Sequence, residues 1–92
     1  MPWERIYYQQ GSIQFWYRDL DGAIENLKKV AAHPDEVDLN TGALAFLRMG
    51  QAYDMKQRHA DAVQEYRLAI AHAPQSDAAT EARKYLSTPY KR

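Results

Sequence analysis

Apolar side chains recur along this chain at three- and four-residue spacing, and no segment sustains the strict alternation of a half-buried strand. Prolines and capping residues divide the pattern into five segments, which predicts helices at about residues 3–17, 20–32, 41–56, 58–73 and 77–86. We expect Asp19 and Ser76 to cap the second and fifth helices, and Asn40 or Thr41 to cap the third. The pattern therefore predicts an all-α fold.

The connections between these helices differ in length. Only two or three residues separate the first two helices, so these two are expected to pack antiparallel. The stretch from Pro34 to Asn40 is acidic and carries no helical stripe, which makes it the longest predicted connection. A polar tail, residues 87–92, follows the fifth helix.

The chain also contains an internal repeat at an offset of 39 residues. At this offset Gly11 falls on Gly50, and the aromatic Tyr7 falls on Phe46. In the second helix of each unit the aligned pairs include Ala23 with Ala62 and Leu27 with Tyr66. A period of this size is typical of stacked helical hairpins, because one hairpin cannot bury its own apolar face. The sequence thus indicates two hairpins and a lone fifth helix.

The second unit resembles the tetratricopeptide repeat. The residues that carry this resemblance, at the family's mutual spacings, are Phe46, Gly50, Tyr53, Ala62, Tyr66, Ala69 and Pro74. The resemblance implies a right-handed stack in a single domain over residues 1–92. Its parts are a first repeat at about 4–34, an acidic linker at 34–40, a second repeat at about 41–74, a capping helix at about 76–86 and the tail.

The resemblance also gives the repeated residues a packing role. Small residues stand where the two helices of a hairpin approach closest, and aromatic residues fill the space between neighbouring hairpins. In the first unit the matching residues are Tyr7, Gly11, Ala23 and Leu27. That unit departs from the family at Gln14, where an aromatic residue is usual, and at Gln10, where an apolar residue is usual. The repeat is also longer than the family's ~34 residues, and we expect the extra residues in the linker.

A tetratricopeptide-like stack implies a concave groove lined by the first helix of each hairpin. Surfaces that combine Trp, Tyr, Met and Arg are typical of binding sites. Because the groove lacks the Lys and Asn constellation with which some family members hold a C-terminal carboxylate, we expect an apolar or amphipathic peptide as ligand. The fifth helix, or the rest of a longer array, would cover the same aromatic residues if no groove is open. The groove positions are Arg5, Tyr8, Gln9, Ser12, Trp16, Leu44, Leu47, Arg48, Gln51, Met55, Glu81 and Tyr85.

Composition and charge narrow the range of partners. The chain has 12 Lys and Arg against 12 Asp and Glu, which argues against a polybasic nucleic-acid binder. No apolar run approaches a membrane span and no secretory signal opens the chain, so membrane insertion is not expected, and the compartment stays open. Residues 1–40 carry a formal charge of −3 and residues 41–92 carry +3. Opposed charges of this kind favour self-association or docking within a larger protein.

The chemistry-bearing residues predict no catalytic, metal or cofactor site. The chain has no cysteine, and no two of its histidines stand four residues apart. His33 and His72 end the second helices of the two units, where we expect them to cap the helix dipole. The carboxylates that cluster lie in turns, and the glycines are too dispersed to cradle a phosphate. We therefore expect a non-enzymatic scaffold that binds a protein or peptide; the alternative is a structural docking or oligomerisation domain.

Overall fold

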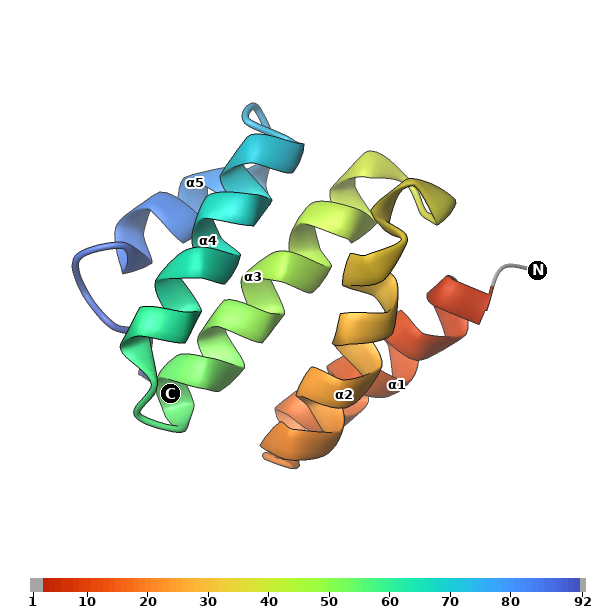
Figure 1. Ribbon diagram of the computed structural model, residues 1–92, viewed down its shortest axis with the longest axis horizontal. Coiled ribbons are helices and arrows are strands. Elements are labelled where there is room, and N and C mark those ends of the chain that lie inside the picture. The colour runs from red at the N-terminus through yellow and green to blue at the C-terminus, as the bar shows by residue number, and fades with distance from the viewer. Residues whose placement is uncertain (1–2, 92) are drawn as a thin grey trace.

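The computed structural model describes residues 3–91, and this part of the chain contains helices and no strand (Figure 1). The predicted all-α fold is confirmed. Each helix lies within about two residues of its expected range. The elements are α1 (Trp3–Trp16), α2 (Leu20–Ala32), a 3-10 turn η1 (Pro34–Glu36), α3 (Leu39–Met55), α4 (His59–His72) and α5 (Asp77–Tyr85).

Side-chain caps explain where three of the helices begin. The Asp19 carboxylate accepts a hydrogen bond from the Gly22 N–H at 3.2 Å, at the start of α2. Ser76 Oγ accepts one from the Ala79 N–H at 3.1 Å, at the start of α5. Both caps were predicted, because a short polar side chain at this position satisfies an N–H that has no partner within the helix.

The prediction for the start of α3 was wrong. Asp38 is the capping residue, and the helix begins at Leu39, inside the expected linker. One carboxylate oxygen accepts the Thr41 N–H at 3.0 Å, and the other accepts the Thr41 hydroxyl at 2.6 Å. These hydrogen bonds stabilise the charged carboxylate and lower the pKa of Asp38. Asn40 and Thr41 therefore lie in the first turn of the helix, and η1 shortens the linker further.

The turns inside the two hairpins have the same backbone geometry. Arg18 and Gln57, which stand 39 residues apart, both adopt a left-handed conformation with φ of 65°. The residue after each donates its N–H to the carbonyl five residues earlier, at 2.8 Å in the first hairpin and 2.9 Å in the second. This is the pattern of a Schellman-type helix end. The internal repeat is thus present in the backbone as well as in the side chains.

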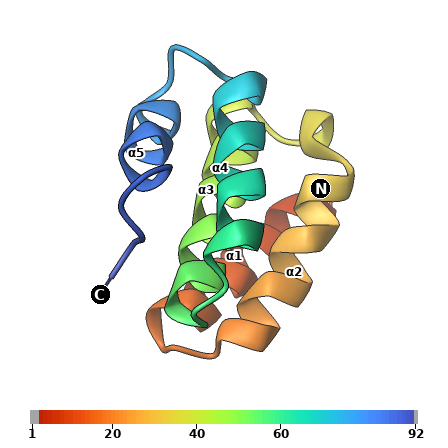
Figure 2. The same cartoon turned by 60° about the vertical axis from the view of Figure 1, so that its left-hand side comes forward.

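The helices pack next to one another in chain order. α1 contacts α2, α2 contacts α3, α3 contacts α4, and α4 contacts α5. In Figure 1, α2 and α4 lie in front of α1 and α5, and Figure 2 shows α5 and α2 on opposite sides of the α3–α4 hairpin. α3 also contacts α1 and α5, so it has helical neighbours on several faces. Its position accounts for the long run of buried residues along it.

Glycine allows the closest helix approach in each hairpin. A Cβ atom added at Gly50 would lie 2.4 Å from the Tyr66 ring, and one added at Gly11 would lie 2.8 Å from Leu27 Cγ. Among the other repeated residues, Tyr7 is half-buried and Pro74, which follows the end of α4, is exposed. The remaining ones are buried: Ala23, Leu27, Phe46, Tyr53, Ala62, Tyr66 and Ala69.

Gln14, which departs from the family pattern, has hydrogen-bond partners in the structure. Its side-chain oxygen accepts from Asn26 Nδ2 in α2 at 2.7 Å, and its nitrogen donates to the Asp19 carboxylate at 3.1 Å. A polar side chain at this half-buried position is satisfied by these partners. It therefore links α1 to α2 by hydrogen bonds where an aromatic residue would link them by packing.

Candidate functional site

Several of the predicted groove residues lie together on a surface shared by α1, α3 and α5, which we call the α1–α3–α5 face. Its members are Trp16 on α1, Arg48 on α3, and Glu81 and Tyr85 on α5, and the buried Gln51 of α3 contacts both Arg48 and Tyr85. The Arg48 guanidinium carbon lies 5.3 Å from the centroid of the Trp16 ring, and Nη1 donates to Gln51 Oε1 at 2.7 Å. An arginine over an aromatic face is attracted by the ring quadrupole. These contacts place the Arg48 guanidinium against both the Trp16 ring and Gln51.

On the α5 side of this face, the hydroxyl of Tyr85 is hydrogen-bonded within the same helix. The Tyr85 hydroxyl donates to Glu81 Oε2 at 3.2 Å. Partial burial raises the pKa of Tyr85, and the neighbouring Glu81 charge raises it further. The phenol therefore stays protonated, and its ring is available for packing.

The groove prediction was wrong for two residues of α3. Leu47 is 2% exposed and belongs to the hydrophobic core, and Gln51 is 3% exposed. The physical reason is that α3 packs against α1 and α5 as well as its own hairpin partner, which leaves little of its surface open. Leu47 cannot contact a ligand, and Gln51 acts as a hydrogen-bond partner beneath Arg48. The half-buried groove residues are Tyr8, Ser12, Leu44, Arg48, Met55, Glu81 and Tyr85; the exposed ones are Arg5, Gln9 and Trp16.

The tail does not extend into solvent as its polar composition suggests. After α5 the chain turns back toward the end of α3 (Figure 1), where Tyr90 contacts Asp54. The Tyr90 ring lies 6.3 Å from the Phe15 ring and 5.2 Å from the Tyr85 ring, measured between centroids. The Tyr90 N–H donates to Asp54 Oδ2 at 2.9 Å. We call the three residues that hold it, Phe15, Asp54 and Tyr85, the tail site.

Asp54 is the charged group at the centre of this site, and its side chain is completely buried. Besides the Tyr90 N–H, it accepts the Tyr66 hydroxyl at 2.6 Å, and its other oxygen lies 2.7 Å from His59 Nδ1. Burial raises the pKa of Tyr66, and the hydrogen bond to Asp54 raises it further, so this phenol remains a donor. A buried carboxylate is stable only when its oxygens have such partners.

Sequence reasoning missed both Asp54 and Tyr90. It treated the carboxylates as turn and surface residues, whereas Asp54 stands between Tyr53 and Met55 on a helix with apolar residues on two faces. An acidic residue at a position that the helix buries is the signal that could have identified it.

The Asp54–His59 pair has the contact found between an orienting carboxylate and a catalytic imidazole, but the surrounding groups do not complete such a site. Among residues 3–91, the only hydroxyl hydrogen-bonded to either group is that of Tyr66. No cluster of three metal-ligating side chains occurs in the described residues. The buried Asp54 carboxylate is suited to accepting an N–H from a peptide backbone, as it does from Tyr90.

No helix within residues 3–91 has the length and apolar content needed to cross a bilayer.

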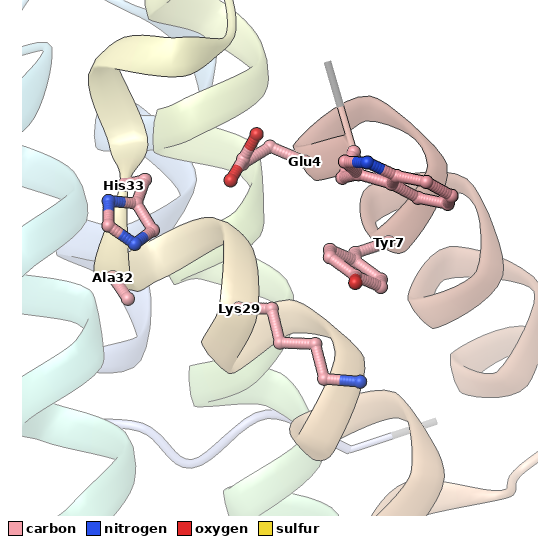
Figure 3. Close-up of a pocket in the computed structure, with 6 residues that line it drawn as sticks. Glu4, Tyr7, Lys29, Ala32 and His33 are labelled. Atoms are coloured by element: carbon pink, nitrogen blue, oxygen red, sulfur yellow. The ribbon is translucent and has the colours of Figure 1, made fainter. Parts of the chain in front are cut away.

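A separate hollow lies between the start of α1 and the end of α2, away from the tail site. It has a volume of about 560 Å³ and is lined by Trp3, Glu4, Tyr7, Lys29, Ala32 and His33 (Figure 3). The Trp3 and Tyr7 rings stack with centroids 6.4 Å apart, and Lys29 Nζ lies 4.6 Å from the Tyr7 centroid. Its polar side chains come from an open surface and converge on no common point, so it offers less for recognition than the tail site.

The two histidines expected to cap helices differ from each other. His33 follows the end of α2 as its C-terminal cap, and its backbone N–H donates to the Val30 carbonyl at 3.0 Å. The His72 ring instead packs edge-on against Phe46 with centroids 5.8 Å apart. Its Nε2 atom is buried without a hydrogen-bond partner in residues 3–91. His72 is therefore a packing residue.

Comparison with models of known protein families, with curated proteins and with solved structures found no match to this chain. The resemblance to the tetratricopeptide repeat thus stays a prediction. It depends on the residues quoted above and on their repetition at one offset.

Proposed function

We propose that this chain is a non-catalytic scaffold of tetratricopeptide-like hairpins that binds a protein or peptide on the α1–α3–α5 face. The observation that carries the proposal is the contact of Trp16 with Arg48. Trp16 is 54% exposed and the Arg48 guanidinium lies against its ring, so a large aromatic surface is accessible beside a cation. Tryptophan, tyrosine and arginine are the residues most enriched where binding energy is concentrated.

The proposal is tested by selecting peptides from a displayed random library on the immobilised chain. Trp16→Ala is the informative variant, and Tyr17→Ala is its matched control. Tyr17 adjoins Trp16 in sequence and is 83% exposed, but it does not belong to the α1–α3–α5 face. We expect Trp16→Ala to weaken the selected peptides at least tenfold, a typical effect of losing a central aromatic residue, while Tyr17→Ala binds like the wild type.

The helicity of both variants is compared with that of the wild type by circular dichroism. Equal binding by Trp16→Ala and the wild type, with both folded, would show that the face is not the binding surface. Failure to enrich any peptide would count against peptide binding as such.

A second function, docking or oligomerisation, is favoured by a separate observation on α1. Ile13 is 59% exposed on this helix, whereas Ala52, which stands one repeat after Ile13, is fully buried. The same helix position is therefore covered in the second hairpin and largely open in the first. We expect a docking surface of this kind to produce self-association at low salt, because the two halves of the chain carry opposite charge. Sedimentation as a monomer at both low and high salt would remove the self-association form of this proposal.

A further inference from the structure

The tail site has the features of a ligand site that the chain's own tail occupies. Tyr90 is half-buried, and the contacts that hold it come from three different helices. The aromatic cluster continues inward, since the Tyr85 ring lies 5.6 Å from the fully buried Tyr66 ring. The site is therefore built into the core of the fold, and only its occupant belongs to an irregular segment.

The contacts define the chemistry of an occupant. The rings of Phe15 and Tyr85 accommodate an aromatic side chain, since aromatic pairs gain from tilted and edge-to-face contacts at these distances. Asp54 accepts a backbone N–H, which any residue except proline provides. An occupant thus needs an aromatic side chain and a free N–H on the same residue.

The tail fills this site incompletely. A hollow of about 260 Å³ lies beside Tyr90, bounded by Arg18, Met55 and Gln57. Another of about 220 Å³ is bounded by Gln57, His59 and Pro89. Two hollows that adjoin the aromatic residue leave space that suits a longer peptide better than a single small aromatic molecule.

We infer that the tail site binds an aromatic residue of a partner's non-helical peptide, and that Tyr90 competes for the site from within the same chain. This inference rests on the proposed function and adds to it the chemistry of the ligand and its regulation. A tail joined to α5 by a few residues has an effective concentration on the order of millimolar. A separate peptide must displace it, so the apparent affinity is the intrinsic affinity multiplied by the fraction of molecules whose site is open.

The test measures binding of a fluorescent peptide with the sequence of residues 86–91 to the full chain by fluorescence anisotropy. Three chains are compared: the wild type, Tyr90→Ala, and Thr88→Ala, which changes an exposed residue of the same tail. We expect Tyr90→Ala to bind the peptide with a Kd lower by about tenfold or more than the other two. Circular dichroism establishes that all three chains are folded.

Two altered peptides test the chemistry of recognition. One replaces the tyrosine with alanine, and the other carries N-methyltyrosine, which keeps the ring but cannot donate to Asp54. We expect each to lose most of its binding to the Tyr90→Ala chain. Equal affinity of the wild type and Tyr90→Ala for the tyrosine peptide would overturn the competition. Equal binding of the tyrosine and alanine peptides would overturn the aromatic specificity.

This experiment separates the inference from the proposed function. If Tyr90→Ala does not bind the tyrosine peptide while library peptides still bind the wild type through Trp16, the inference fails and the proposed function stands. If no library peptide binds either the wild type or Tyr90→Ala, both fail.

Discussion

Replacing Gly50 with alanine tests the closest helix approach in the second hairpin. The added Cβ would lie 2.4, 2.6 and 3.0 Å from three atoms of the Tyr66 ring. Carbon atoms in contact normally stand about 3.5–4.0 Å apart, so the ring and α3 must separate by roughly 1 Å. The Tyr66 ring cannot rotate away freely, because it is fully buried and its hydroxyl donates a hydrogen bond to Asp54 at 2.6 Å.

The expected magnitude follows from two opposing effects. Overpacking of a dense core costs about 1–3 kcal/mol. In the Gly50→Ala variant, displacement of the Tyr66 ring would also distort its hydrogen bond to Asp54, so we expect a cost at the upper end of this range. Alanine gains about 1 kcal/mol over glycine inside a helix. We expect Gly50→Ala to lower the free energy of unfolding by about 2 kcal/mol, which corresponds to a fall in Tm of about 8–16 °C for a domain of this size.

The assay is urea unfolding followed by far-UV circular dichroism, with Gly11→Ala as the matched control from the first hairpin. There the added Cβ meets Leu27 at 2.8 and 3.0 Å. A leucine side chain adapts more easily than a bonded tyrosine ring, so Gly11→Ala should cost about 1 kcal/mol less. If Gly50→Ala is as stable as the wild type, or if Gly11→Ala is the more damaging change, the described approach of α3 and Tyr66 is wrong.

Substitutions at three further positions test backbone strain, hydrogen bonding and charge. Gln57→Gly should stabilise the chain by about 1 kcal/mol by relieving the positive φ, while Gln57→Ala should not; equal Tm values for the two would contradict this. Tyr66→Phe should destabilise by about 1.5–3 kcal/mol in urea unfolding, because the Asp54 carboxylate loses a buried donor; an unchanged midpoint would contradict it. Burial raises the pKa of Glu65, so the folded state holds its proton more tightly and stability falls as pH rises above 4.5. Glu65→Gln should therefore be more stable than the wild type at neutral pH, with a difference that shrinks in acid; a constant difference between the two Tm values across pH would contradict this.

Local signals made the helices predictable from the sequence. A cap such as Ser76 or a stop such as Pro74 acts on its immediate neighbours, so the residue types suffice to locate it. The start of α3 was missed because three polar residues within four positions, Asp38, Asn40 and Thr41, have side chains that could act as the cap. The choice depends on which side chain reaches a free N–H, and that is a matter of geometry.

The candidate site was predictable only in part. The resemblance placed Trp16 and Arg48 on the first helices of the two hairpins and Tyr85 on the fifth helix, and the structure brings Trp16 and Arg48 into contact. Burial of Leu47 could not be foreseen, because it depends on how closely α3 is packed between its neighbours. The contact between Asp54 and Tyr90 joins residues 36 positions apart and has no counterpart in the repeat pattern.

The returning tail has a consequence for how the molecule unfolds. In a linear stack each unit contacts only its neighbours, so either end can fray on its own. Tyr90 joins the segment after the last helix to Phe15 in the first helix. This contact closes the stack on itself, so loss of structure at one end removes support from the other. The two hairpins and the last helix should therefore unfold as a single cooperative unit, and release of the tail should return them to nearest-neighbour behaviour.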